Sequence, residues 1–103
     1  MSKLSVIAKL TATDGKESEL EAALASLVTA ADAEDGLEVY SAHAANDEPG
    51  VFYFFEIYRD ADALAVHGKT DGMRAAMGAV GALLAGRPEV IGMRPVAAKG
   101  LAV

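Results

Sequence analysis

Cysteine is absent from this 103-residue sequence, which excludes disulfides, thiolate metal sites and a cysteine nucleophile. The absence is compatible with a reducing compartment, and we expect a cytoplasmic protein. The two histidines and the scattered carboxylates show no recognised metal-ligand spacing, so we predict no metal site.

Positive charge and long apolar segments are also scarce. Nine Lys and Arg residues stand against fifteen Asp and Glu residues, which gives a net charge of −6. Nucleic acids and anionic membranes both favour clustered positive charge, so we expect neither as a partner. No apolar stretch approaches the roughly 20 residues that cross a bilayer. The N-terminal apolar run is too short for a signal peptide.

Aromatic residues are few, and five of the six fall within Val51–Arg59 (VFYFFEIYR). This segment predicts a central β-strand that is buried on both faces. Glu56 is its one acidic residue and shares a face with Phe52, Phe54 and Tyr58. A carboxylate without a partner would be costly there.

The rest of the chain alternates between strand and helix patterns. The predicted elements are a strand over Leu4–Leu10, a helix from about Lys16 to Ala33, a strand over Leu37–Ala45, a short helix over Asp60–His67, a helix from about Gly72 to Leu84, and an extended segment over Val90–Ala97. Asp14 and Glu17 have the spacing of a capping box for the first long helix, and Gly36 is expected to end it. Either Thr70 or Asp71 can cap the last helix.

Strict alternation assigns the side chains of the second strand to two faces. Leu37, Val39, Ser41 and His43 are predicted on one face, with Glu38, Tyr40, Ala42 and Ala44 on the other. Four glycines in and after the last helix (Gly72, Gly78, Gly81 and Gly86) indicate either a mobile lid or close packing on the sheet, and we favour close packing. Pro95 favours an edge position for the last strand.

The element order βαββαβ, with its second helix broken in two, predicts an α+β ferredoxin-like (split βαβ) fold over one domain, residues 1–103. Both helices would cover one face of a four-stranded antiparallel sheet. The other face would be apolar and bare, and a second copy of the same sheet is the simplest cover. We therefore predict a homodimer that pairs through the open sheet face.

Three segments carry a family resemblance: Gly36–Tyr40 (GLEVY), Phe55–Tyr58 (FEIY) and Asp62–His67 (DALAVH). On these segments the chain resembles the antibiotic biosynthesis monooxygenase (ABM) domain family of the dimeric α+β barrel group. The resemblance implies a small cofactor-independent oxygenase that acts on quinols or phenols. Haem-degrading relatives depend on a tryptophan, which this chain lacks. Many relatives also carry a second histidine, where this chain has Gly72.

The resemblance and the residue chemistry together give the candidate site. His67 is the expected base that removes a proton from a phenol or quinol, and Glu56 is expected to orient its ring or to hold the ring charged. A purely structural Glu56–His67 hydrogen bond would explain the same pair. The predicted substrate-binding residues are Tyr40, Tyr58, Phe54 and His43. Tyrosines in the core and an exposed strand histidine are the alternatives for this second group.

Two functions follow as hypotheses. The first is a cofactor-independent monooxygenase or related oxidoreductase that acts on a small aromatic, quinol-like substrate. The alternative is a non-catalytic dimeric barrel that binds a small ligand or serves in a stress response. An RNA-binding domain is disfavoured because the chain is acidic. The enzyme hypothesis requires a pocket of a few hundred Å³ with His67 at its wall.

Overall fold

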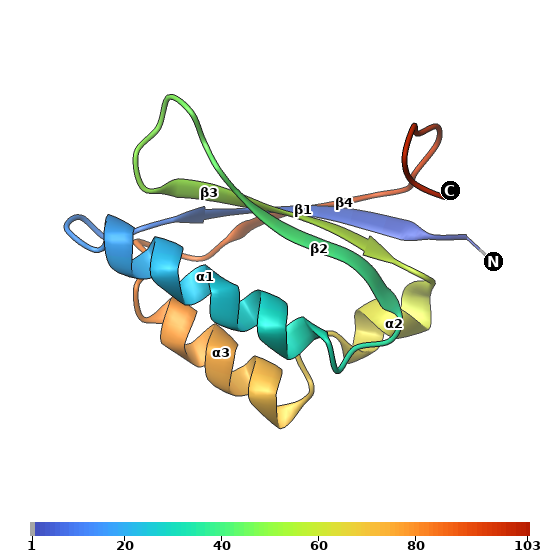
Figure 1. The fold of residues 1–103 in the computed structure, drawn as a ribbon, viewed down its shortest axis with the longest axis horizontal. Coiled ribbons are helices and arrows are strands. Elements are labelled where there is room, and N and C mark those ends of the chain that lie inside the picture. Colours follow the sequence, from blue (N-terminus) through green and yellow to red (C-terminus); the bar gives the residue numbers. More distant parts are fainter. Residues whose placement is uncertain (1) are drawn as a thin grey trace.

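The computed structural model describes residues 2–103. The chain forms β1 (Leu4–Thr11), α1 (Glu17–Ala31), β2 (Leu37–Ala44), β3 (Val51–Tyr58), α2 (Ala61–Val66), α3 (Asp71–Gly81) and β4 (Glu89–Met93). This is the predicted βαββαβ order, with the second helix broken into α2 and α3 (Figure 1). Among residues 2–103, no helix combines the length and the apolar character that crossing a bilayer requires.

The four strands form one antiparallel sheet in the order β2-β3-β1-β4. The aromatic strand β3 lies between β2 and β1, as its composition predicts. β2 and β3 form the expected hairpin. β4 is an edge strand that ends two residues before Pro95, which confirms the interpretation of that proline. The ferredoxin-like fold class is therefore confirmed.

Helices α1 and α3 lie side by side on one side of the sheet (Figure 1). They bury an apolar core against the sheet face that carries Phe52 and Phe54. The main core residues from the helices are Leu20, Leu24, Leu27, Met73, Ala76 and Val80. The core therefore sits between one helix layer and one sheet face.

The opposite sheet face carries no helix of the described chain (Figure 1). We call it the bare face; its side chains are Ser5, Ile7 and Lys9 from β1, Val39, Ser41 and His43 from β2, Val51, Tyr53, Phe55 and Ile57 from β3, and Glu89, Ile91 and Met93 from β4. Most of these residues are apolar or aromatic. The edge residue Ile91 is 60% exposed, so the face presents apolar surface to solvent.

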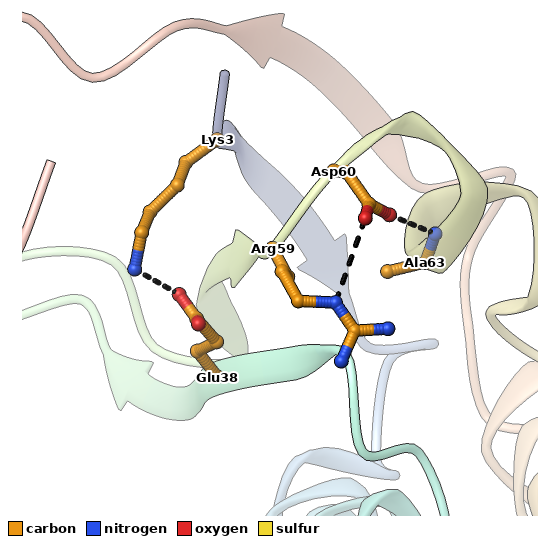
Figure 2. A network of polar contacts seen from close by, with 5 residues as sticks. All are labelled: Lys3, Glu38, Arg59, Asp60 and Ala63. Atoms are coloured by element: carbon orange, nitrogen blue, oxygen red, sulfur yellow. Dashed lines mark hydrogen bonds and ion pairs between the residues drawn. The ribbon is translucent and has the colours of Figure 1, made fainter. Parts of the chain in front are cut away.

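The predicted face assignment of β2 is wrong at its first residue. Leu37 and Val39 pair with the adjacent β3 residues Tyr58 and Ile57, so Glu38 is an extra residue in a β-bulge. The bulge turns Leu37 to the helix side, where it joins the core, while Val39 stays on the bare face. The side chain of Glu38 forms an ion pair with Lys3 (Figure 2).

The ends of α1 also differ from the prediction. The N-cap is Lys16 and makes no side-chain capping bond, so the Asp14–Glu17 capping box does not form. Gly15 has a φ of +85°, and the turn it makes delays the helix start to Glu17. The helix ends at Ala31, well before Gly36. At α3, Thr70 is the cap, and its hydroxyl accepts a hydrogen bond from the backbone N–H of Met73.

Gly36 has a packing role instead of a helix-ending one. A Cβ at this position would lie 2.5 Å from the Cβ of Ala63 in α2. The carbonyl of Gly36 also accepts a hydrogen bond from the backbone N–H of Arg59, at 2.8 Å. The missing side chain therefore lets α2 approach the loop between α1 and β2.

The start of α2 is fixed by Asp60. Its carboxylate accepts a hydrogen bond from the backbone N–H of Ala63 at 2.9 Å and lies 3.5 Å from the Nε of Arg59 (Figure 2). This cap and the close contact of Gly36 with Ala63 fix the first turn of α2, and His67 follows its last residue, Val66.

The favoured explanation of the glycines in and after α3 is wrong. A Cβ added at Gly72, Gly78, Gly81 or Gly86 would meet nothing within 4 Å. None of the four is therefore required by close packing.

Candidate functional site

A cavity of about 480 Å³ lies between the helix side of the sheet and α3. We call it the sheet–helix cavity. Its lining is almost entirely apolar and includes Val6, Ala8, Leu10, Leu27, Phe54, Leu64, Met77, Val80, Leu84, Pro88 and Val90. Leu64 of α2, Met77 of α3 and Val90 of β4 are each more than a third exposed. The cavity therefore opens to solvent between α2, α3 and the edge strand β4. Its volume is in the range of small-molecule binding sites.

The polar groups of the cavity come from three elements: Tyr40 of β2, Glu56 and Tyr58 of β3, and His67 at the end of α2. The rings of Tyr40 and Tyr58 each meet the His67 ring edge-on, with centroids 5.5 Å apart. Four of the predicted site residues thus converge on one small region. The apolar remainder of the lining makes this region the only polar end of the cavity among the described residues.

Glu56 is paired with Tyr58 and not with His67. The Tyr58 hydroxyl donates a hydrogen bond of 2.5 Å to Oε1 of Glu56. Both side chains are buried, and they sit two residues apart on the same face of β3. The buried carboxyl group that the sequence marks as costly is therefore satisfied by its own strand.

His67 instead contacts Glu34, a residue that the sequence analysis does not identify. The Nδ1 of His67 lies 2.8 Å from Oε1 of Glu34. Glu34 lies in the loop between α1 and β2 and is 6% exposed. The prediction that Glu56 orients the imidazole is thus wrong in its partner, because Glu34 occupies that position. No periodicity or motif distinguishes Glu34 from the neighbouring loop acids.

Tyr40 and Phe54 form the aromatic wall beside His67. Their rings stack with centroids 4.5 Å apart at an angle of 26°. Both line the cavity. A flat ligand can therefore contact an aromatic surface on one side while its polar substituent lies near the His67 ring.

His43 is the predicted residue that the structure does not bring to this cavity. It pairs with Tyr53 on the bare face, and its Nε2 lies 2.8 Å from the hydroxyl of Ser41. It is exposed on the side of the sheet away from His67. Among residues 2–103, no three acidic or imidazole side chains converge as a metal-binding group.

Comparison with protein families identifies the family of this chain. The model of the antibiotic biosynthesis monooxygenase family matches residues 4–79. The chain belongs to this family. A search among curated proteins gives no significant match.

Solved structures of similar chains cover nearly the whole protein. A candidate antibiotic biosynthesis monooxygenase from Caulobacter crescentus is 33% identical, with a TM-score of 0.84, and the match covers 93% of this chain and 92% of that one. PA3566 from Pseudomonas aeruginosa is 30% identical (TM-score 0.83; 94% and 97% covered). Rv0793 from Mycobacterium tuberculosis is also 30% identical (TM-score 0.82; 94% and 98% covered).

Burial governs the protonation of the acids in this ABM cavity. Burial raises the pKa of Glu56 above its ordinary value, and the nearby Glu34 adds to the rise, while the Tyr58 hydrogen bond and His67 oppose it. Burial, with Glu56 and Glu34 nearby, also raises the pKa of Tyr40. Burial and the bond to Glu56 raise the pKa of Tyr58. Both phenols therefore stay protonated and can act as hydrogen-bond donors.

The raised pKa of Glu56 predicts a pH dependence of stability. Between the unfolded and the folded pKa, the folded state binds more protons, so the free energy of unfolding falls as pH rises through this window. Glu56→Gln keeps an acceptor for Tyr58 and removes the titration. We therefore expect the free energy of unfolding of the variant to fall less with rising pH than that of the parent. Urea unfolding of both proteins from pH 4 upward measures the difference. Parallel curves for the two proteins would contradict the assignment.

Proposed function

We propose that this ABM-family chain is a cofactor-independent monooxygenase for a small, neutral quinol or phenol. The sheet–helix cavity carries the proposal: an apolar, solvent-connected space of about 480 Å³ whose polar end holds His67. The family and its structural relatives support an oxidoreductase activity of this kind. In the proposed complex the ring lies along Phe54 and Tyr40, with its hydroxyl directed at His67.

The lining favours an uncharged substrate. None of the residues that line the cavity is Lys or Arg, and Glu56 lies at its polar end, with Glu34 behind His67. An anionic substituent would lose its water without gaining a positive partner. A hydroxyl group can instead share hydrogen bonds with His67 and the Tyr40 phenol.

The proposed chemistry starts with proton transfer from the substrate hydroxyl to His67. General base catalysis of this type contributes roughly 10²–10⁴-fold in rate. The resulting electron-rich anion reduces O₂ directly. A phenol with an unsubstituted position and one O₂ give the quinone and one water, so one oxygen atom enters the product. The substrate supplies all the electrons, and the balance requires no flavin, metal or second reductant.

Oxygen uptake tests this proposal. The protein is incubated with neutral quinols and phenols and, as matched controls, with the same rings bearing a carboxylate. We expect uptake only with neutral rings, one product per O₂ consumed, and ¹⁸O from ¹⁸O₂ in the product. Saturable binding of neutral rings without uptake above the protein-free rate would refute the enzyme and support the non-catalytic ligand-binding alternative.

We further propose that two copies pair through the bare face. Most side chains of the bare face are apolar or aromatic, and Ile91 on the edge strand is exposed. An isologous pairing would remove this surface from water.

The pairing predicts that a charge on the bare face yields monomers. Ile91→Asp is expected to shift the sedimentation coefficient from dimer to monomer and to leave the circular dichroism spectrum unchanged, because Ile91 is exposed in the single chain. Val66→Asp is the control, since Val66 is 53% exposed but lies on α2. A parent protein that sediments as a monomer at micromolar concentration would contradict the pairing.

A further inference from the structure

The Glu34–His67 pair points to a role for an acid outside the substrate space. We propose that Glu34 is a positioning residue that fixes the protonated nitrogen of His67 as Nδ1 and leaves Nε2 as the base for the substrate. The catalytic half of this statement rests on the function proposed above. Its structural half, the protonation pattern of the ring, stands on the Glu34 contact alone.

The chemistry of the Glu34–His67 contact assigns the hydrogen on the ring. An ionised carboxylate can only accept hydrogen bonds, so with Glu34 as the carboxylate the Nδ1 of His67, 2.8 Å away, is the nitrogen that carries the hydrogen. In the neutral ring the other nitrogen, Nε2, is then the acceptor. Since His67 also lines the cavity, Nε2 is the nitrogen left for a ligand. After proton uptake, the same carboxylate stabilises the positively charged ring.

Glu34 is buried, and His67 is the one side chain of the described residues that hydrogen-bonds its carboxylate. Its Oε1 faces His67, and its Oε2 is buried without a hydrogen-bond partner among residues 2–103. A buried carboxylate that leaves one oxygen unsatisfied carries a free-energy cost. The imidazole of His67 is therefore the principal partner of Glu34. An exposed side chain at this position would avoid the cost of burial, so stability alone does not explain a buried glutamate here.

Backbone hydrogen bonds hold the loop that carries Glu34. The backbone N–H of Glu34 donates to the carbonyl of Ala31 at 2.9 Å, and its carbonyl accepts from the N–H of Leu37 at 3.0 Å. The close approach of Gly36 to Ala63 ties the same loop to α2, which ends at His67. Both partners are thus held by neighbouring backbone, as a positioning contact requires.

The experiment compares three variants by NMR and by oxygen uptake. Nitrogen-15 spectra of the histidine side chains in the resting protein report which ring nitrogen carries hydrogen. Glu34→Gln keeps an acceptor without charge, Glu34→Ala removes the acceptor, and Asp35→Asn is the matched control in the same loop, where Asp35 is exposed. The neutral quinol with the highest uptake in the parent protein serves as the substrate.

We expect the Nδ1–H form of His67 in the parent, in Asp35→Asn and in Glu34→Gln, and a mixture of forms in Glu34→Ala. By comparison with carboxylates that orient metal-bound histidines, kcat should fall roughly 10–100-fold in Glu34→Ala. A smaller fall is expected in Glu34→Gln, with KM little changed in both. If Glu34→Ala does not fold, the nitrogen-15 spectrum of the parent and the kcat of Glu34→Gln still test the inference.

An Nε2–H form in the parent would overturn the inference, as would unchanged kcat in both Glu34 variants. The Nδ1–H form in a protein that oxidises no quinol would support the positioning contact and refute the proposed function, so the two failures are distinguishable.

Discussion

Replacing His67 with glutamine is expected to lower oxygen uptake by roughly 10²–10⁴-fold, the usual contribution of a general base. Glutamine can still donate a hydrogen bond to the buried Glu34, which alanine cannot, so the loss would reflect the missing base and not a damaged fold. Initial rates with a neutral quinol, together with thermal unfolding, measure the two effects separately.

The second histidine provides the comparison. His43→Gln is expected to retain the parent rate, because His43 lies on the bare face beside Ser41 and does not line the sheet–helix cavity. Equal losses in the two variants, or no loss in His67→Gln, would contradict the assignment of the base.

The second large effect is expected at Gly36. In Gly36→Ala the new methyl group would lie 2.5 Å from the Cβ of Ala63, so α2 or the loop must move. Overpacking of this kind typically destabilises a protein by about 1–3 kcal/mol. In a domain of this size, 1 kcal/mol lowers the Tm by about 4–8 °C. Activity should fall further than stability explains, because the same movement separates Glu34 from His67.

Gly78→Ala is the matched control for Gly36→Ala. Gly78 lies inside α3, and an added Cβ meets nothing within 4 Å. Alanine is the better helix former by about 1 kcal/mol, so this change should raise the Tm and leave activity intact. Urea unfolding of both variants measures the change in stability. A stabilised Gly36→Ala variant would show that the close approach of Gly36 to Ala63 is unimportant.

The fold could be predicted from the sequence because its signals are local. The aromatic run of β3, the turn before it and the helical spacing of Leu20, Leu24 and Leu27 each identify an element. The burial of Glu56 also follows from its alternation with aromatic residues. These patterns depend on residues close together in the chain, where the periods of strands and helices act directly.

The partners within the site could not be predicted in the same way. Glu34 and His67 are 33 residues apart, and Glu34 lies in a loop where acids are usually exposed to solvent. The bulge at Glu38 is a similar case, since one additional residue changes the face of Leu37 without changing the apolar pattern. Both features depend on how loops and strands meet in three dimensions.

The sheet–helix cavity and the bare face lie on opposite sides of the same sheet. A partner chain seated on the bare face adds no wall to the cavity. Each copy should then take up one ligand independently, and saturation curves should be hyperbolic with a Hill coefficient near one.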